Sequence, residues 1–194
     1  MQILHPLAGS PQQYLTQLAD PGLHRPASCP QCQAKQPLTA HGFYTRTILD
    51  TGFDGAIRIR RYLCQLCRRT VSLLPEFALP FLRSSIPVIA LWLLARLGRP
   101  QSHPPPSMPY QRGQFWLRRF CRQAESLSAA LAALTSPVPA PNFVDRALAM
   151  LSATGFVPAH RFLFSALRQH LLGWPPSLAP VGRRLTLSPV PPAT

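Results

Sequence analysis

Alternating apolar and polar positions mark a β-rich segment in the first half of the chain. The stretch AHGFYTRTIL mixes aromatic and β-branched residues and predicts a strand, which the turn-forming residues DTGFDG follow. In the next stretch, AIRIRRYL, Ile57 and Ile59 point to one face while Arg58 and Arg60 point to the other. The segment TVSLL adds a short third strand. The pattern therefore predicts a β-hairpin with one short additional strand.

A period close to 3.6 residues replaces this alternation further along the chain and predicts helices. The apolar run at 86–97, IPVIALWLLARL, predicts a helix capped by Ser84 or Ser85 and ended by Gly98. Pro87 is compatible with this helix because proline is tolerated in a first turn. A bilayer-spanning helix needs about 20 apolar residues, so this shorter run indicates a buried helix.

The remaining helices are separated by proline-rich sequence. After the break GRPQSHPPPSMP, apolar residues at helical spacing predict a second helix from about Tyr110 to Leu134. Residues 142–172 predict two more helices, with a break near Gly155 and Pro158. The final segment is rich in proline and poor in acidic residues, and predicts a disordered tail.

Four of the five cysteines form two CxxC pairs, CPQC at 29–32 and CQLC at 64–67. Two such pairs place four thiolates around one ion with Zn–S distances of about 2.3 Å, which predicts a single structural Zn²⁺ held by Cys29, Cys32, Cys64 and Cys67. Four thiolates leave no open coordination position, so catalytic zinc is not expected. A redox CxxC, two disulfides and an iron–sulfur cluster are the alternatives. Cys121 is expected to be a core or half-buried thiol on a helix, with no partner indicated.

Positive charge dominates the polar residues. Lys and Arg total 20 against 6 Asp and Glu, which gives a formal net charge of +14. Such a balance favours polyanions such as DNA, although an arginine-rich composition inherited from a GC-rich genome is an alternative explanation. The arginines with a candidate nucleic-acid-binding role form a group beside the second cysteine pair and a group on the long helix: Arg58, Arg60, Arg61, Arg68, Arg69, Arg112, Arg118, Arg119 and Arg122.

The segment from residue 28 to about residue 82 resembles a known family. Both CxxC pairs, the HGFYTR strand, the RYLCQLCRRT segment and the following LPEFALP are similar to the zinc ribbon at the N-terminus of insertion-sequence transposases and short transposase-like bacterial proteins. The run FWLRRF at 115–120 looks like part of the helix-turn-helix region that often follows. The resemblance implies DNA binding at the ends of mobile elements, with the four cysteines as zinc ligands.

The resemblance does not extend to the nuclease domain of full transposases, which holds two metal ions with three carboxylates. Only Glu125 and Asp145 lie beyond the β-rich segment, so no carboxylate triad is available. The chain is therefore expected not to be an enzyme, and no small-molecule substrate is expected. It is expected to be a cytoplasmic, nucleoid-associated protein without a signal peptide or membrane partner.

These patterns predict an α+β chain in which a small zinc ribbon precedes a helical region. The expected parts are an N-terminal arm or short helix at 1–27, the ribbon at 28–80, a helix-turn-helix-like region at 81–135, additional helices at 136–173 and a tail at 174–194. The expected function is that of a non-catalytic, zinc-dependent DNA-binding protein, either a truncated transposase or an accessory protein that acts with a transposase. The alternative is a zinc-ribbon module that docks on a polymerase or a transposase partner.

Overall fold

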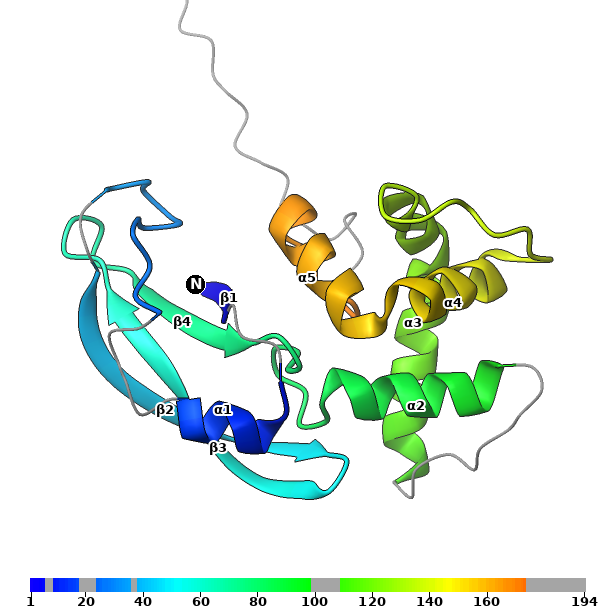
Figure 1. Cartoon of the computed structure of the whole chain (residues 1–194), viewed down its shortest axis with the longest axis horizontal. Coiled ribbons are helices and arrows are strands. Elements are labelled where there is room, and N and C mark those ends of the chain that lie inside the picture. The colour runs from blue at the N-terminus through cyan, green and yellow to red at the C-terminus, as the bar shows by residue number, and fades with distance from the viewer. Residues whose placement is uncertain (6–8, 18–23, 36–37, 99–108, 174–194) are drawn as a thin grey trace, which may run out of the picture.

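The chain folds into a strand half and a helical half that lie side by side (Figure 1). The computed structural model describes residues 1–5, 9–17, 24–35, 38–98 and 109–173. Within them a four-stranded sheet and five helices form an α+β fold. Most of the proline-rich break after Gly98 and all of the tail expected at 174–194 lie outside the described residues.

The three strands expected from the alternating pattern are all present. Strand β2 (Thr39–Asp50) and strand β3 (Phe53–Leu63) form an antiparallel hairpin, and β4 (Thr70–Pro75) pairs antiparallel with β3. The hairpin turn is tighter than the DTGFDG stretch predicts, because β3 already begins at Phe53. Gly52 provides the turn with a φ of 75°, which other residues rarely adopt.

A fourth strand lies in the segment that was expected to hold only an arm or a short helix. Strand β1 (Gln2–His5) pairs parallel with β4, which gives the order β1-β4-β3-β2. The prediction of a hairpin with one additional strand is therefore wrong by one strand. Four residues are too few to show a period, and their hydrogen-bonding partner lies about seventy residues further along the chain. The expected short helix is present as α1 (Pro11–Gln17), which packs against β3.

Two small apolar clusters stabilise the sheet. Ile48, Ile57, Ile59 and Leu74 pack with Tyr14 of α1 and with the segment after β4. The second cluster surrounds the cysteines and includes Leu38, Tyr62, Val71 and Leu73. The burial of Ile57 and Ile59, with Arg58 exposed between them, confirms the predicted alternation in β3.

The first helix of the helical half has the predicted ends. Helix α2 (Ile86–Leu97) is capped by Ser85, whose Oγ accepts a hydrogen bond from the N–H of Val88 at 3.3 Å. Its C-terminal cap is Gly98, as the sequence predicts. The Ser85 hydroxyl also donates to Asp50 Oδ1 at 2.5 Å, so the start of α2 is tied to the end of β2.

Three further helices complete one large apolar core with α2. They are α3 (Tyr110–Leu131), α4 (Phe143–Thr154) and α5 (Phe156–Leu167). Helix α3 ends at Leu131, somewhat before the predicted Leu134, and the break between α4 and α5 falls at Gly155 as predicted. Trp92 of α2 and Trp116 of α3 meet edge to face at 6.0 Å between ring centroids.

Glycine is required where α2 and α3 cross. A Cβ atom on Gly113 would lie 2.2 Å from Cζ2 of the Trp92 ring. The helix-turn-helix arrangement expected at 81–135 stays a prediction. Helices α2 and α3 contact each other, but residues 98–109 separate them, which is longer than the three or four residues typical of that motif.

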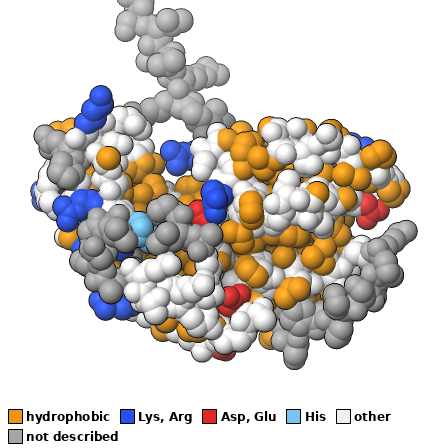
Figure 2. Space-filling model, in the orientation of Figure 1, with side chains coloured by type: hydrophobic (Ala, Val, Ile, Leu, Met, Phe, Trp, Pro, Cys, Tyr) orange, Lys and Arg blue, Asp and Glu red, His pale blue; other side chains and the backbone are white. Residues whose placement is uncertain are grey.

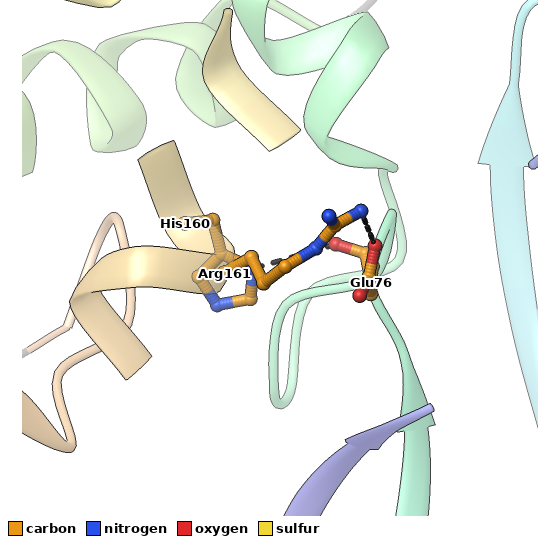
Figure 3. Close-up of polar contacts among 3 residues, drawn as sticks. All are labelled: Glu76, His160 and Arg161. Carbon is orange, nitrogen blue, oxygen red and sulfur yellow. Dashed lines mark hydrogen bonds and ion pairs between the residues drawn. The ribbon is translucent and has the colours of Figure 1, made fainter. Parts of the chain in front are cut away.

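A buried polar cluster joins the two halves. Glu76, directly after β4, forms an ion pair with Arg161 of α5 (Figure 3). The carboxylate side chain is only 3% exposed, whereas the arginine is 47% exposed. His160 Nδ1 lies 3.3 Å from the carbonyl oxygen of Glu76, and His160 Nε2 lies 3.1 Å from Nδ1 of His170. These contacts fix the position of α5 relative to the sheet.

Among the described helices, none is by itself long and apolar enough to cross a membrane. Helices α4 and α5 meet the length and composition criteria only as a pair, and they are bent by 101° at their break.

Candidate metal centre and arginine surfaces

The two CxxC pairs sit in loops with the same backbone conformation. In the first loop the N–H of Gln33 donates to the Cys29 carbonyl at 2.8 Å, and the N–H of Cys29 donates to Ala34 at 3.0 Å. The second loop repeats both bonds from Arg68 to Cys64 and from Cys64 to Arg69, at 2.9 and 3.0 Å. We call these loops the first knuckle (Cys29–Ala34) and the second knuckle (Cys64–Arg69). The repeated pair of backbone hydrogen bonds indicates that both loops have the same structural role.

The residue after each second cysteine adopts a left-handed conformation. Gln33 has a φ of 60° and Arg68 a φ of 57°, a region in which glycine is the least strained residue. This conformation closes each knuckle by allowing the backbone to turn back toward its first cysteine. The chain therefore tolerates strain at two equivalent positions to bring four sulfur atoms together.

The tertiary fold converges the two knuckles. The first lies before β2 and the second connects β3 to β4, so the β2–β3 hairpin returns the chain to the point from which it started. The Sγ atoms of Cys29 and Cys67 are 3.7 Å apart, as are those of Cys32 and Cys64. All four sulfur atoms lie within 4.8 Å of one another.

These distances fit a metal ion and exclude disulfides in this conformation. Four sulfur atoms placed tetrahedrally at about 2.3 Å from Zn²⁺ are separated by roughly 3.8 Å, whereas a disulfide requires about 2.05 Å. Cys29 and Cys64 are buried, and Cys32 and Cys67 are more accessible. The four predicted ligands therefore lie together in a site that could bind a metal ion.

The thiols are in unequal electrostatic environments. The backbone N–H of Cys32, together with that of Gln31, lowers the pKa of Cys29 to about 7 despite burial. At Cys67 the N–H of Arg69 acts in the same direction, but desolvation and the neighbouring sulfur atoms outweigh it and raise the pKa to about 11. A divalent cation removes this repulsion by binding all four sulfur atoms as thiolates.

Two of the β3 arginines are stacked on one aromatic ring. The guanidinium groups of Arg58 and Arg60 lie 4.2 and 4.7 Å from the centroid of Phe43 on β2. Arg58 is exposed, but Arg60 is only 8% exposed and also lies 5.3 Å from the Tyr62 ring. Arg60 therefore serves packing within the sheet more than the surface. The sequence pattern did not reveal the role of Phe43, which depends on the register of β2 against β3.

The second knuckle presents arginines at the surface. Arg68 and Arg69 are exposed, and Arg61 on β3 is half-buried. The Arg68 guanidinium donates to Gln65 Oε1 of the same knuckle at 3.0 Å. In the view of Figure 2, most Lys and Arg side chains lie over the strand half, whereas the helical half shows mainly apolar side chains.

The arginines of α3 are not brought together with those of the sheet. The two groups lie on different halves of the molecule (Figure 1). Arg119 donates to the Leu172 carbonyl at 2.9 Å and lies 4.5 Å from the Phe115 ring, and desolvation lowers its pKa. Arg118 and Arg122 are exposed and Arg112 is half-buried. Of the α3 group, Arg118 and Arg122 are thus the most available for a ligand.

Comparison with known proteins gives one family match. Residues 29–102 match a family described as a domain of unknown function, DUF6431. The match begins at the first cysteine and spans both knuckles, the β2–β4 strands and α2. No curated protein and no solved structure matches the chain.

Proposed function

We propose that this chain is a non-catalytic DNA-binding protein in which one structural Zn²⁺ holds a zinc ribbon, related to the N-terminal modules of insertion-sequence transposases. The observation that carries the proposal is the convergence of four sulfur atoms, all within 4.8 Å of one another, from two equivalent knuckles, one of which presents exposed arginines. The metal orders the knuckles, and the arginines of the second knuckle neutralise DNA phosphates.

The two knuckles differ in a way that favours a role for the second. Both contain a non-glycine residue in the left-handed conformation, which costs of order 1 kcal/mol. At this position the first knuckle has the uncharged Gln33, whereas the second has Arg68 followed by Arg69. A cation in a strained position on a metal-ordered loop is consistent with selection for binding an anion.

The proposal is tested by replacing each left-handed residue with glycine. The Arg68→Gly variant relieves strain and removes one cation, while Gln33→Gly relieves equivalent strain at the same backbone position without changing the charge. We expect duplex DNA affinity, measured by fluorescence anisotropy, to fall only for Arg68→Gly. The slope of log affinity against log salt should decrease by about 0.9 if Arg68 contacts one phosphate.

Equal affinities for the two variants would remove Arg68 from the interface, and wild-type binding that does not respond to salt would contradict the phosphate mechanism. Metal analysis of the same samples tests the proposed zinc site. We expect one zinc per chain in the wild-type protein and in both glycine variants, because neither substitution removes a thiolate.

Leu66 favours a second candidate function, docking on a partner protein such as a polymerase or a transposase. This side chain lies between Cys64 and Cys67 and is 70% exposed, so the second knuckle also presents an apolar group. A Leu66→Ser variant that loses a nuclease-resistant partner in pull-down experiments, but retains DNA affinity, would support docking over DNA binding at this loop.

A further inference from the structure

The connection between β4 and α2 displays a phenylalanine at the tip of a tight turn. The N–H of Leu82 donates to the Leu79 carbonyl at 3.4 Å, with Pro80 and Phe81 as the two central residues. Phe81 has a φ of 62°, the sign that the third position of a type II turn requires and that glycine normally provides. Its side chain is nevertheless 99% exposed.

This turn is held firmly by the neighbouring strand. The guanidinium group of Arg46 on β2 donates to the Leu79 carbonyl at 3.0 Å and also to the Leu82 carbonyl. The residues that follow are attached to the end of β2, where the N–H of Leu49 donates to Arg83 at 2.8 Å and the N–H of Ser85 donates to Leu49 at 2.9 Å. Phe81 is therefore presented on a fixed scaffold.

The energetics of Phe81 are unfavourable for the isolated chain. A large residue in the left-handed region costs of order 1 kcal/mol or more, and a fully exposed ring recovers none of this through burial. A residue that is both strained and exposed, on a turn clamped at both ends, indicates a contact with a ligand outside the chain.

The surroundings of the ring are basic. One hollow beside it, of about 560 Å³, is lined by Tyr44, Arg46 and Arg83 among others. A second, of about 490 Å³, is lined by Arg168 and His170 with Phe164. Among the described residues, no carboxylate lines either hollow, although Arg83 forms an ion pair with the nearby Asp54 at 2.5 Å. Each hollow therefore places an arginine beside the ring, Arg83 in the first and Arg168 in the second.

We propose that Phe81 is a stacking platform for an unpaired base of single-stranded DNA, with the adjoining phosphates placed near Arg83 and Arg168. This inference rests on the proposed DNA-binding function and assigns it a second surface, the clamped Leu79–Leu82 turn between β4 and α2. An aromatic face flanked by cations is the arrangement by which proteins bind single strands without reading their sequence.

The experiment compares three substitutions at Phe81 in the full-length protein loaded with zinc. Phe81→Gly removes the ring and relieves the strain, Phe81→Leu keeps an apolar side chain without an aromatic face, and Phe81→Trp keeps the face. The probes are a fluorescently labelled oligo(dT) single strand and a labelled duplex. We expect single-strand affinity to fall on the order of tenfold for the glycine and leucine variants, and to be retained for Phe81→Trp.

Duplex affinity should change little in all three variants, and the single strand should quench the emission of Phe81→Trp more than that of the wild type, which has three tryptophans of its own. If the leucine variant binds single strands as tightly as the wild type, the aromatic face is not used, the inference fails and a protein partner becomes the better occupant. If the wild type binds the duplex but not the single strand, the inference fails while the proposed function stands. If the wild type binds neither, both fail.

Discussion

The strand half and the helical half reach stability by different means. The helical half surrounds one continuous apolar core that includes Trp92, Trp116 and Phe120. The sheet divides its apolar residues between two small clusters, and one of them is built around the cysteines themselves. Small units of this kind bury too little apolar surface to fold alone, so a metal ion or another covalent constraint is usually needed.

The two halves therefore differ in what stabilises them, and the half that is expected to depend on a metal is also the half that is expected to bind DNA. Metal binding is expected to determine whether the strand half folds, and the same half carries most of the exposed arginines in the view of Figure 2. The helical half depends on close packing, which the Gly113–Trp92 contact illustrates. The Glu76–Arg161 ion pair couples the two, and the predictions below test each half and the contact between them.

The largest effect is expected from removing a metal ligand. A Cys64→Ser variant should lose bound zinc and, with it, a free energy on the order of 10 kcal/mol that supports the strand half. We expect strand signals in the amide NMR spectrum to collapse while helical circular dichroism is largely retained. Cys121→Ser is the matched control, because Cys121 lies on α3 away from the four sulfur atoms and is exposed there, not in the core or half-buried as the sequence suggested. A metal-free variant with intact strands would refute the comparison.

In the helical half, Gly113→Ala tests the close packing. The added methyl group would overlap the rigid Trp92 ring, and overpacking of this kind costs about 1–3 kcal/mol even after the better helix propensity of alanine is included. Urea unfolding followed by tryptophan emission should show the loss. Gln114→Ala, one position along the same helix, should be neutral or slightly stabilising. A stabilised Gly113→Ala protein would show that α2 and α3 do not cross so closely.

The coupling between the halves is tested by Arg161→Ala. This substitution leaves the nearly buried Glu76 carboxylate without its ion pair and should cost about 2 kcal/mol, at the low end for buried pairs because the arginine is half exposed. Arg96→Ala, an exposed arginine at the end of α2, is the control. Separate unfolding transitions for the two halves in the Arg161→Ala variant would confirm that this contact joins them, whereas unchanged stability would contradict that role.

The smallest effect is expected from acid titration of the same junction. Desolvation by burial, with the positive charge of His170 as a lesser cause, lowers the pKa of His160 from 6.5 to about 4, and burial lowers that of His170 to about 4 as well. The unfolded chain therefore binds protons more readily than the folded one. Stability is fully present above pH 6.5 and is lost as the pH falls toward 4.

Acid also releases zinc from thiolates, so the titration needs a probe of the helical half and a variant of the junction. Emission from Trp92 and Trp116 provides the probe because both rings lie in the helical core. A His160→Asn variant should show a smaller acid step in this signal, because only His170 of the pair still titrates. If the step persists unchanged in that variant, His160 is not the group that titrates.

Much of this organisation was predictable from local signals. The ends of α2 follow from a serine cap, a proline in the first turn and a terminal glycine, all of which act within a few residues of one another. The alternation in β3 is equally local, and the spacing of the two CxxC pairs predicted which side chains meet. The register of β2 against β3 was not predictable in this way, and it decides that Phe43 lies beneath Arg58 and Arg60.

The sequence by itself determined most element types, the ends of α2 and which four cysteines lie together, because periodicity, capping and CxxC spacing are properties of neighbouring residues. Only the tertiary structure decided that β1 completes the sheet, that Arg60 and Arg119 are engaged within the protein while Arg68 is exposed, and that Glu76 meets Arg161. These outcomes depend on which distant segments come into contact. The tertiary fold, and not the local propensity of each segment, determines which distant residues come into contact.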